Sequence, residues 1–175
     1  AIADIDADGH PEVIQGRVVL NGGNGTLKFQ GTAGLGTNGF MGPVSIASDL
    51  GLDGRTEVLA GNTAYDIVGT PLWTTPYAIP ITAGNCQSSG KPCDGFSATG
   101  NFDADDQGEV VIVRAGTIYI LNHDGSPMIA GGGPVQIVMP VDDCTKNEGG
   151  PPTVADFDGD GKAEIGVAGA DYYMV

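Results

Sequence analysis

Short hydrophobic runs, each preceded by a cluster of alternating acidic residues, recur four times along this chain. The runs are rich in β-branched residues, and segments containing Gly or Pro separate one run from the next. They are Val13-Ile14, Val58–Gly61, Val110–Val113 and Ile165–Gly169. No window shows a sustained helical period, so the pattern predicts an all-β chain with many turns.

Further strands can be placed on both sides of each run. A strand before the acidic cluster is predicted at 44–47, 96–98 and 153–155. A strand after the hydrophobic run is predicted at 17–20, 63–66, 117–121 and 172–175. The last strand of the unit is predicted at 26–29, 72–74 and 127–129. The second and third units are therefore predicted to be complete. The first is predicted to lack its opening strand, and the fourth its last strand.

The acidic clusters begin at residues 4, 49, 101 and 156, which gives steps of 45, 52 and 55 residues. Steps of this size are typical of the four-stranded blades of a β-propeller. We therefore expect an all-β fold in which residues 1–175 form one β-propeller segment of about three and a half blades. Its repeats would cover approximately 1–42, 43–94, 95–150 and 151–175.

Incomplete outer units leave two alternatives. The chain is a piece of a larger propeller, which we favour, or a neighbouring copy supplies strands at the open edges. Long connections at 31–42, 76–95 and 130–152 join the units. Such connections gather on one face of a propeller, where we expect a protein or carbohydrate ligand to bind.

The formal net charge is −15, and 15 of the 22 Asp and Glu residues lie in the four acidic clusters. Only 7 residues are Lys or Arg, so the basic surface needed for binding nucleic acid is absent. No apolar stretch reaches the roughly 18–20 residues of a membrane-spanning helix. The charge is thus concentrated in four short loops.

Each acidic cluster approaches a nine-residue pattern, D-x-D-x-D-G-x-x-E, and the first and fourth match it fully. Oxygen atoms at positions 1, 3, 5 and 9, with the carbonyl of position 7, would surround a hard cation such as Ca²⁺. The candidate ligands are Asp4, Asp6, Asp8, His10 and Glu12; Asp49, Asp53, Arg55 and Glu57; Asn101, Asp103, Asp105, Gln107 and Glu109; and Asp156, Asp158, Asp160, Lys162 and Glu164. EF-hands are excluded, because they need an acid at position 12 and flanking helices.

Two loops depart from the pattern. The third has Asn101 at position 1 and Asp106 where the others have Gly, while the second has Gly51 at position 3 and loses a ligand. Water could complete the second loop, or it could be metal-free, so three to four Ca²⁺ ions are expected. The alternative is a set of acidic turns without metal. Four ions would bring the formal charge from −15 to −7, so metal binding and folding should be coupled.

The segment Val154–Ile165 carries a specific resemblance. Its sequence, Val-Ala-Asp-Phe-Asp-Gly-Asp-Gly-Lys-Ala-Glu-Ile, resembles the FG-GAP (VCBS-like) repeats that form the blades of integrin α-subunit propellers and of many bacterial exported proteins. The resemblance covers nearly the whole chain, although the Phe-Gly/Gly-Ala-Pro signature is degenerate. It implies Ca²⁺ in the hairpin loop between the first two strands of a blade, and a bacterial protein that is secreted or on the cell surface. It implies no single activity.

The chain shows no catalytic motif. Its two histidines, His10 and His123, fall in turns, and no nucleophile elbow, P-loop or zinc motif is present. We therefore expect a non-enzymatic adhesion or ligand-binding module. The alternatives are the propeller part of a carbohydrate-active enzyme such as a polysaccharide lyase, and a self-assembling structural subunit completed by strand exchange.

Three cysteines add one expectation. Cys86 and Cys93 flank the polar segment 87–92, where a buried structural cysteine is not expected. A local disulfide between them would suit an exported protein. Cys144 would then be left to pair with a chain outside this sequence. The alternative is three unrelated reduced thiols.

Overall fold

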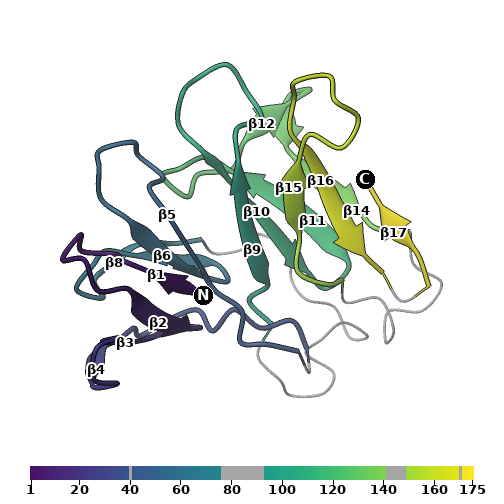
Figure 1. The fold of residues 1–175 in the computed structure, drawn as a ribbon. Helices are drawn as coiled ribbons and strands as arrows, with labels where there is room; N and C mark the ends of the chain where they lie inside the picture. The colour runs from purple at the N-terminus through teal and green to yellow at the C-terminus, as the bar shows by residue number, and fades with distance from the viewer. Residues whose placement is uncertain (40, 76–92, 141–148, 170) are drawn as a thin grey trace.

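Four antiparallel sheets follow one another along the chain and lie side by side in the computed structural model (Figure 1). The structure describes residues 1–39, 41–75, 93–140, 149–169 and 171–175. These residues form strands and turns only, so none of them belongs to a helix long and apolar enough to cross a membrane. The all-β prediction is confirmed.

The first two sheets each contain four strands in sequence order. They are β1 (Ile2–Ala3), β2 (Glu12–Gln15), β3 (Val18–Leu20) and β4 (Leu27–Gln30), then β5 (Ile46–Ser48), β6 (Glu57–Ala60), β7 (Thr63–Tyr65) and β8 (Pro71–Thr74). The prediction that the first unit lacks its opening strand is wrong, because β1 pairs with β2 through Ile2↔Val13 and Ala3↔Glu12. A two-residue strand is too short to show the alternation that identifies strands in sequence.

The third sheet has the order β14-β11-β10-β9, and the fourth has β15-β16-β17. Their strands are β9 (Phe96–Gly100), β10 (Glu109–Arg114), β11 (Thr117–Leu121), β14 (Gln136–Val138), β15 (Thr153–Ala155), β16 (Glu164–Ala168) and β17 (Tyr173–Met174). The fourth sheet therefore has three strands among the described residues, with β17 at its edge.

The outer strand of the third sheet differs from the prediction. The Met128 amide donates to the Ile120 carbonyl at 3.0 Å, as expected for a strand at 127–129. The chain then leaves the sheet as a small hairpin of β12 (Ile129–Ala130) and β13 (Gly133–Pro134), and β14 completes the pairing with β11. Gly131 and Gly132, with φ of 63° and 89°, make this turn possible.

Hydrophobic residues join each sheet to the next. One cluster combines Ile14, Val19 and Phe29 of the first sheet with Val58 and Tyr65 of the second. Two further clusters connect the second sheet to the third and the third to the fourth. Alternate residues of β10 enter different clusters, so this strand is buried on both faces, which explains its continuous apolar sequence.

Two polar side chains tie distant segments together. The Asp94 carboxylate accepts hydrogen bonds from the amides of Leu35, Gly36 (3.1 Å) and Thr37 (3.0 Å), and from the Thr37 hydroxyl at 2.8 Å. Asn38 is fully buried, and its Nδ2 donates to the Gly149 carbonyl at 2.9 Å. The sequence pattern gave neither residue a role.

Cys93 is buried, with 8% of its surface exposed, so the expectation that this cysteine is not buried is wrong. Cys86 and Cys144 lie outside the described residues, and the Cys86–Cys93 disulfide stays a prediction.

Peptide mapping under non-reducing conditions should recover Cys86 and Cys93 in one linked peptide. Closing so short a loop stabilises a fold by about 2–3 kcal/mol. Cys86→Ser should therefore lower the melting temperature, whereas Cys144→Ser should leave it near the original value. A Cys93–Cys144 peptide, or free thiols at both Cys86 and Cys93, would rule the pairing out.

Candidate metal centres

Each acidic loop connects the first strand of its sheet to the second. The loops lie between β1 and β2, β5 and β6, β9 and β10, and β15 and β16. The two strands are antiparallel neighbours in every case, so each loop closes a hairpin. The carboxylates of one loop thus belong to a single sheet.

The glutamate at position 9 has a structural role that the sequence did not suggest. Its Oε2 accepts a hydrogen bond from the amide of the residue at position 2 in all four loops. The distances are 3.1 Å for Glu12 and Ile5, 2.8 Å for Glu57 and Leu50, 2.6 Å for Glu109 and Phe102, and 2.7 Å for Glu164 and Phe157. One carboxylate oxygen of the glutamate therefore closes each loop.

Aspartates at other positions organise the loop backbone. The position-5 side chains, Asp8, Asp53, Asp105 and Asp160, each accept from the amide of position 7 at 2.7–2.9 Å. The position-1 side chains Asp4, Asp49 and Asp156 each accept from the amides of positions 5 and 6. Binding of a cation by the position-7 carbonyls of His10, Arg55, Gln107 and Lys162 stays a prediction.

Glycine at position 6 allows the tight turn that the sequence predicted. Gly9, Gly54 and Gly161 have φ of 87°, 82° and 89°, a region that other residues rarely adopt. The third loop has Asp106 at this position, and its backbone follows another course. There Asn101 Nδ2 donates to the Asp105 carbonyl at 2.6 Å.

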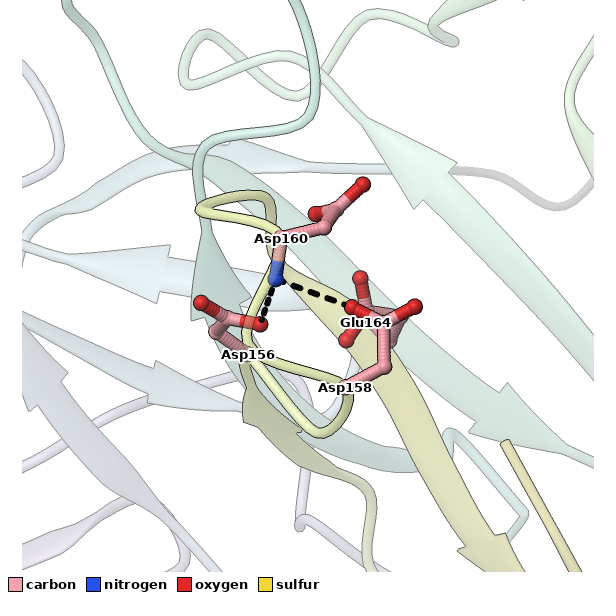
Figure 2. Close-up of side chains that lie close together, drawn as sticks. All are labelled: Asp156, Asp158, Asp160 and Glu164. Atoms are coloured by element: carbon pink, nitrogen blue, oxygen red, sulfur yellow. Dashed lines mark hydrogen bonds between the residues drawn. The ribbon is translucent and has the colours of Figure 1, made fainter.

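The fourth loop brings a full set of carboxylates together (Figure 2). Asp156, Asp158, Asp160 and Glu164 each offer one oxygen, and these four atoms lie within 4.8 Å of one another. The Asp160 amide donates to Asp156 Oδ1 at 3.1 Å and to Asp158 Oδ1 at 3.0 Å, which fixes the loop between the side chains. Four close oxygens suit a hard divalent cation.

The other loops form smaller clusters. In the third, Asp103, Asp105 and Glu109 meet the same 4.8 Å limit, and in the first, Asp4, Asp6 and Asp8 do so without Glu12. Asp49, Asp53 and Glu57 of the second loop form no such group among the described residues. Several acidic clusters can therefore hold a metal ion, and the fourth loop offers the most ligands.

Lys28 contacts the first loop, and the sequence pattern did not suggest this contact. Its Nζ forms ion pairs with Asp6 and, at 3.2 Å, with Glu12 Oε1. The hydrogen bond to Asp6 raises the pKa of Lys28, and the same bond lowers the pKa of Asp6. No local sequence signal links Lys28 to a loop 16 to 22 residues away.

Two of the position-9 glutamates have raised pKa values, in contrast to the lowered pKa of Asp6. Desolvation raises the pKa of Glu57 and of Glu109, and neighbouring Asp carboxylates of the same loop add to the rise. A proton or a metal ion would each relieve this unfavourable burial of negative charge.

The stability of the calcium-free protein and that of the calcium-bound protein should therefore change with pH in opposite directions. In EGTA, stability should fall as pH rises above 4.5, the ordinary value for Glu, because a raised pKa favours the folded state only while the glutamate is protonated. The lowered pKa values of Asp6, Asp124 and Asp160 act below about pH 4 and do not reverse this trend. In Ca²⁺, stability should rise over the same range, because ligands must be deprotonated.

Melting temperatures between pH 4.5 and 7 in EGTA and in Ca²⁺ will measure the two slopes. Glu109→Gln should flatten the slope in EGTA. Parallel slopes in the two buffers would show that the glutamates do not couple to metal.

A hollow of about 480 Å³ lies between the third and fourth loops. Its lining is Asn101, Phe102, Asp103, Gly161, Lys162 and Ala163. The predicted ligand face, in contrast, is formed by connections that include residues 76–92 and 141–148, which lie outside the described residues. The position of a ligand on that face stays a prediction.

Comparison with known proteins finds similarity among solved structures. No protein-family model matches the chain, and no curated protein matches it. Among solved structures, the chain is similar to the V. cholerae biofilm matrix protein Bap1, with a TM-score of 0.60 and 26% sequence identity. The match covers 90% of this chain and 22% of the Bap1 chain, so this chain spans about a fifth of that protein's length.

Proposed function

We propose that this chain is a calcium-stabilised extracellular module with a role in adhesion or ligand binding. The observation that carries the proposal is the fourth loop, where four carboxylates of one hairpin lie within 4.8 Å of one another. The similarity to a biofilm matrix protein supports an extracellular setting and an adhesive role.

Calcium is the cation that the donor set favours. All candidate ligands are oxygens, three of the four in the fourth loop are exposed, and no cysteine or histidine side chain belongs to the described clusters. Zinc and copper prefer nitrogen and sulfur ligands, and Mg²⁺ demands a compact octahedron, whereas Ca²⁺ accepts flexible oxygen cages. When bound, the ion would supply positive charge that offsets the repulsion among the carboxylates.

We further propose that the four sheets are consecutive blades of a β-propeller. Support comes from their meander order and from the hydrophobic clusters that join each sheet to the next. The first sheet and the fourth sheet lie at opposite ends of the array in Figure 1. Further sheets of a longer protein, or a neighbouring copy, would cover the edge strand β17, where Tyr173 is 56% exposed.

A binding role is favoured over a catalytic one. His10 is exposed and His123 lies in the turn after β11, where its carbonyl accepts from the Trp73 indole at 3.0 Å. The sequence also carries no nucleophile elbow, P-loop or zinc motif. We therefore propose that partners bind to the surface of the module and are not chemically changed.

Retention on biofilm exopolysaccharide will test the adhesive role. Exopolysaccharide extracted from a biofilm culture is coupled to beads, and the purified chain is passed over it in Ca²⁺ and in EGTA. We expect retention in Ca²⁺ and release in EGTA. An Asp158→Ala variant should be retained less than an Asp53→Ala variant. Failure to bind the beads in Ca²⁺, together with failure to bind intact biofilm, would contradict the proposal.

A further inference from the structure

Lys28 is not part of the first acidic loop, but its positive charge contacts two acids of that loop. The residue lies on β4, the outer strand of the first sheet, and its ammonium donates to Asp6 Oδ2 and to Glu12 Oε1. The lysine side chain is 17% exposed and that of Glu12 is 2% exposed. The contact with Glu12 is therefore partly buried and is screened less by water than a surface ion pair, whereas the contact with Asp6 is exposed.

The two acids that Lys28 contacts are the candidate metal ligands at positions 3 and 9. Glu12 Oε2 already accepts from the Ile5 amide, so the ion pair with Lys28 engages its second oxygen as well. Glu12 is accordingly absent from the cluster of Asp4, Asp6 and Asp8. A divalent cation in this loop would lose one ligand, share another with the ammonium, and be repelled by it.

The other loops lack this arrangement. In the fourth, Glu164 joins the cluster, and Lys162 pairs with Asp160 from the solvent side, 79% exposed. Within the described part of the second and third loops, no lysine or arginine forms an ion pair with the carboxylates. The first loop thus matches the nine-residue pattern fully in sequence and differs from the fourth in its surroundings.

We propose that Lys28 is the resident cation of the first loop. Its ammonium neutralises Asp6 and Glu12, so that this hairpin folds without a divalent ion while the fourth loop takes Ca²⁺. The inference rests on the proposed function, in which the other loops bind calcium. Its consequence is that the first sheet keeps its loop closed when calcium falls, whereas the fourth sheet responds to it.

Calcium titration by calorimetry on four proteins will test this inference. Lys28→Met removes the charge and keeps much of the apolar stem, so it should add one calcium site or tighten the weakest site at least tenfold. Lys28→Arg keeps the charge and should retain the original ion count. Arg17→Met is the control: it removes a positive charge from the same sheet, where the guanidinium donates to the Thr32 carbonyl at 3.0 Å, and it should also retain that count. An unchanged count and affinity in Lys28→Met would overturn the inference.

Amine labelling of the unmodified protein gives a second test that does not depend on a variant folding. Acetylation should be slow at Lys28 and fast at Lys162, and Ca²⁺ should leave the rate at Lys28 unchanged. An increase at Lys28 on adding Ca²⁺ would show that the ion displaces the ammonium, and would also overturn the inference.

If the original protein binds calcium but Lys28→Met gains none, the inference fails alone. If the original protein binds no calcium, the proposed function fails.

Discussion

Removing calcium with EGTA is expected to lower the melting temperature of this chain by more than 10 °C. An ion that binds only the folded state at a hundred times its dissociation constant stabilises it by about 2.7 kcal/mol. Two ions, one each in the third and fourth loops, would contribute about 5 kcal/mol. For a chain of this size each kcal/mol corresponds to about 2–4 °C, so a loss of about 10–20 °C follows.

Two variants assign this effect to particular loops. Asp158→Ala removes a carboxylate from the four-ligand cluster, and Asp53→Ala removes one from the second loop, which forms no such cluster among the described residues. The substitutions are matched, because Asp158 Oδ1 and Asp53 Oδ1 each accept one loop amide, at 3.0 Å and 2.9 Å. Asp158→Ala should therefore cost more stability in Ca²⁺, and both should cost little in EGTA.

Differential scanning calorimetry in Ca²⁺ and in EGTA measures these effects. Identical melting curves in the two buffers would mean that calcium does not stabilise the fold. Equal losses for the two variants in Ca²⁺ would mean that the fourth loop is not the stronger site.

The second large effect is expected from Asp94→Ala. The substitution leaves the amides of Leu35, Gly36 and Thr37 without the carboxylate that accepts from them. A buried donor left unsatisfied costs about 1–3 kcal/mol. These three hydrogen bonds are partly buried, so the free energy of unfolding should fall by about 3 kcal/mol, at the low end of that range. Unlike the loop variants, this one should lose the same stability with and without calcium, because Asp94 lies outside the acidic loops.

Asp124→Ala is the matched control for Asp94→Ala. Asp124 accepts hydrogen bonds from the amide and the side chain of Ser126, two residues along the same turn, so its loss should cost about 1 kcal/mol. Urea denaturation of both variants compares the two losses. Similar losses would show that Asp94 acts as an ordinary turn residue and does not clamp two distant segments.

Local patterns in the sequence predicted the repeated part of the fold well. The run after each position-9 glutamate forms the second strand of a sheet, and 117–121 and 153–155 become β11 and β15 without change. These segments carry their own signal, since β-branched residues and flanking turns are adjacent in sequence. The positive φ of Gly9, Gly54 and Gly161 was equally predictable from glycine at a fixed loop position.

Features that depend on contacts between distant residues could not be predicted. Asp94 accepts from amides 57–59 residues away, and Lys28 reaches Asp6 across 22 residues. Neither residue differs in local sequence from an exposed charged side chain. For the same reason, the sequence treated the first and fourth loops as equivalent, although only the fourth gathers all four carboxylates.

Calcium anomalous scattering from crystals grown with CaCl₂ will show directly whether the acidic loops bind calcium. An anomalous peak is expected in the fourth loop, about 2.3–2.6 Å from oxygens of Asp156, Asp158, Asp160 and Glu164. A second peak is expected in the third loop, and none beside Lys28. A map with no peak in any of the four loops would contradict the claim that this chain is stabilised by calcium.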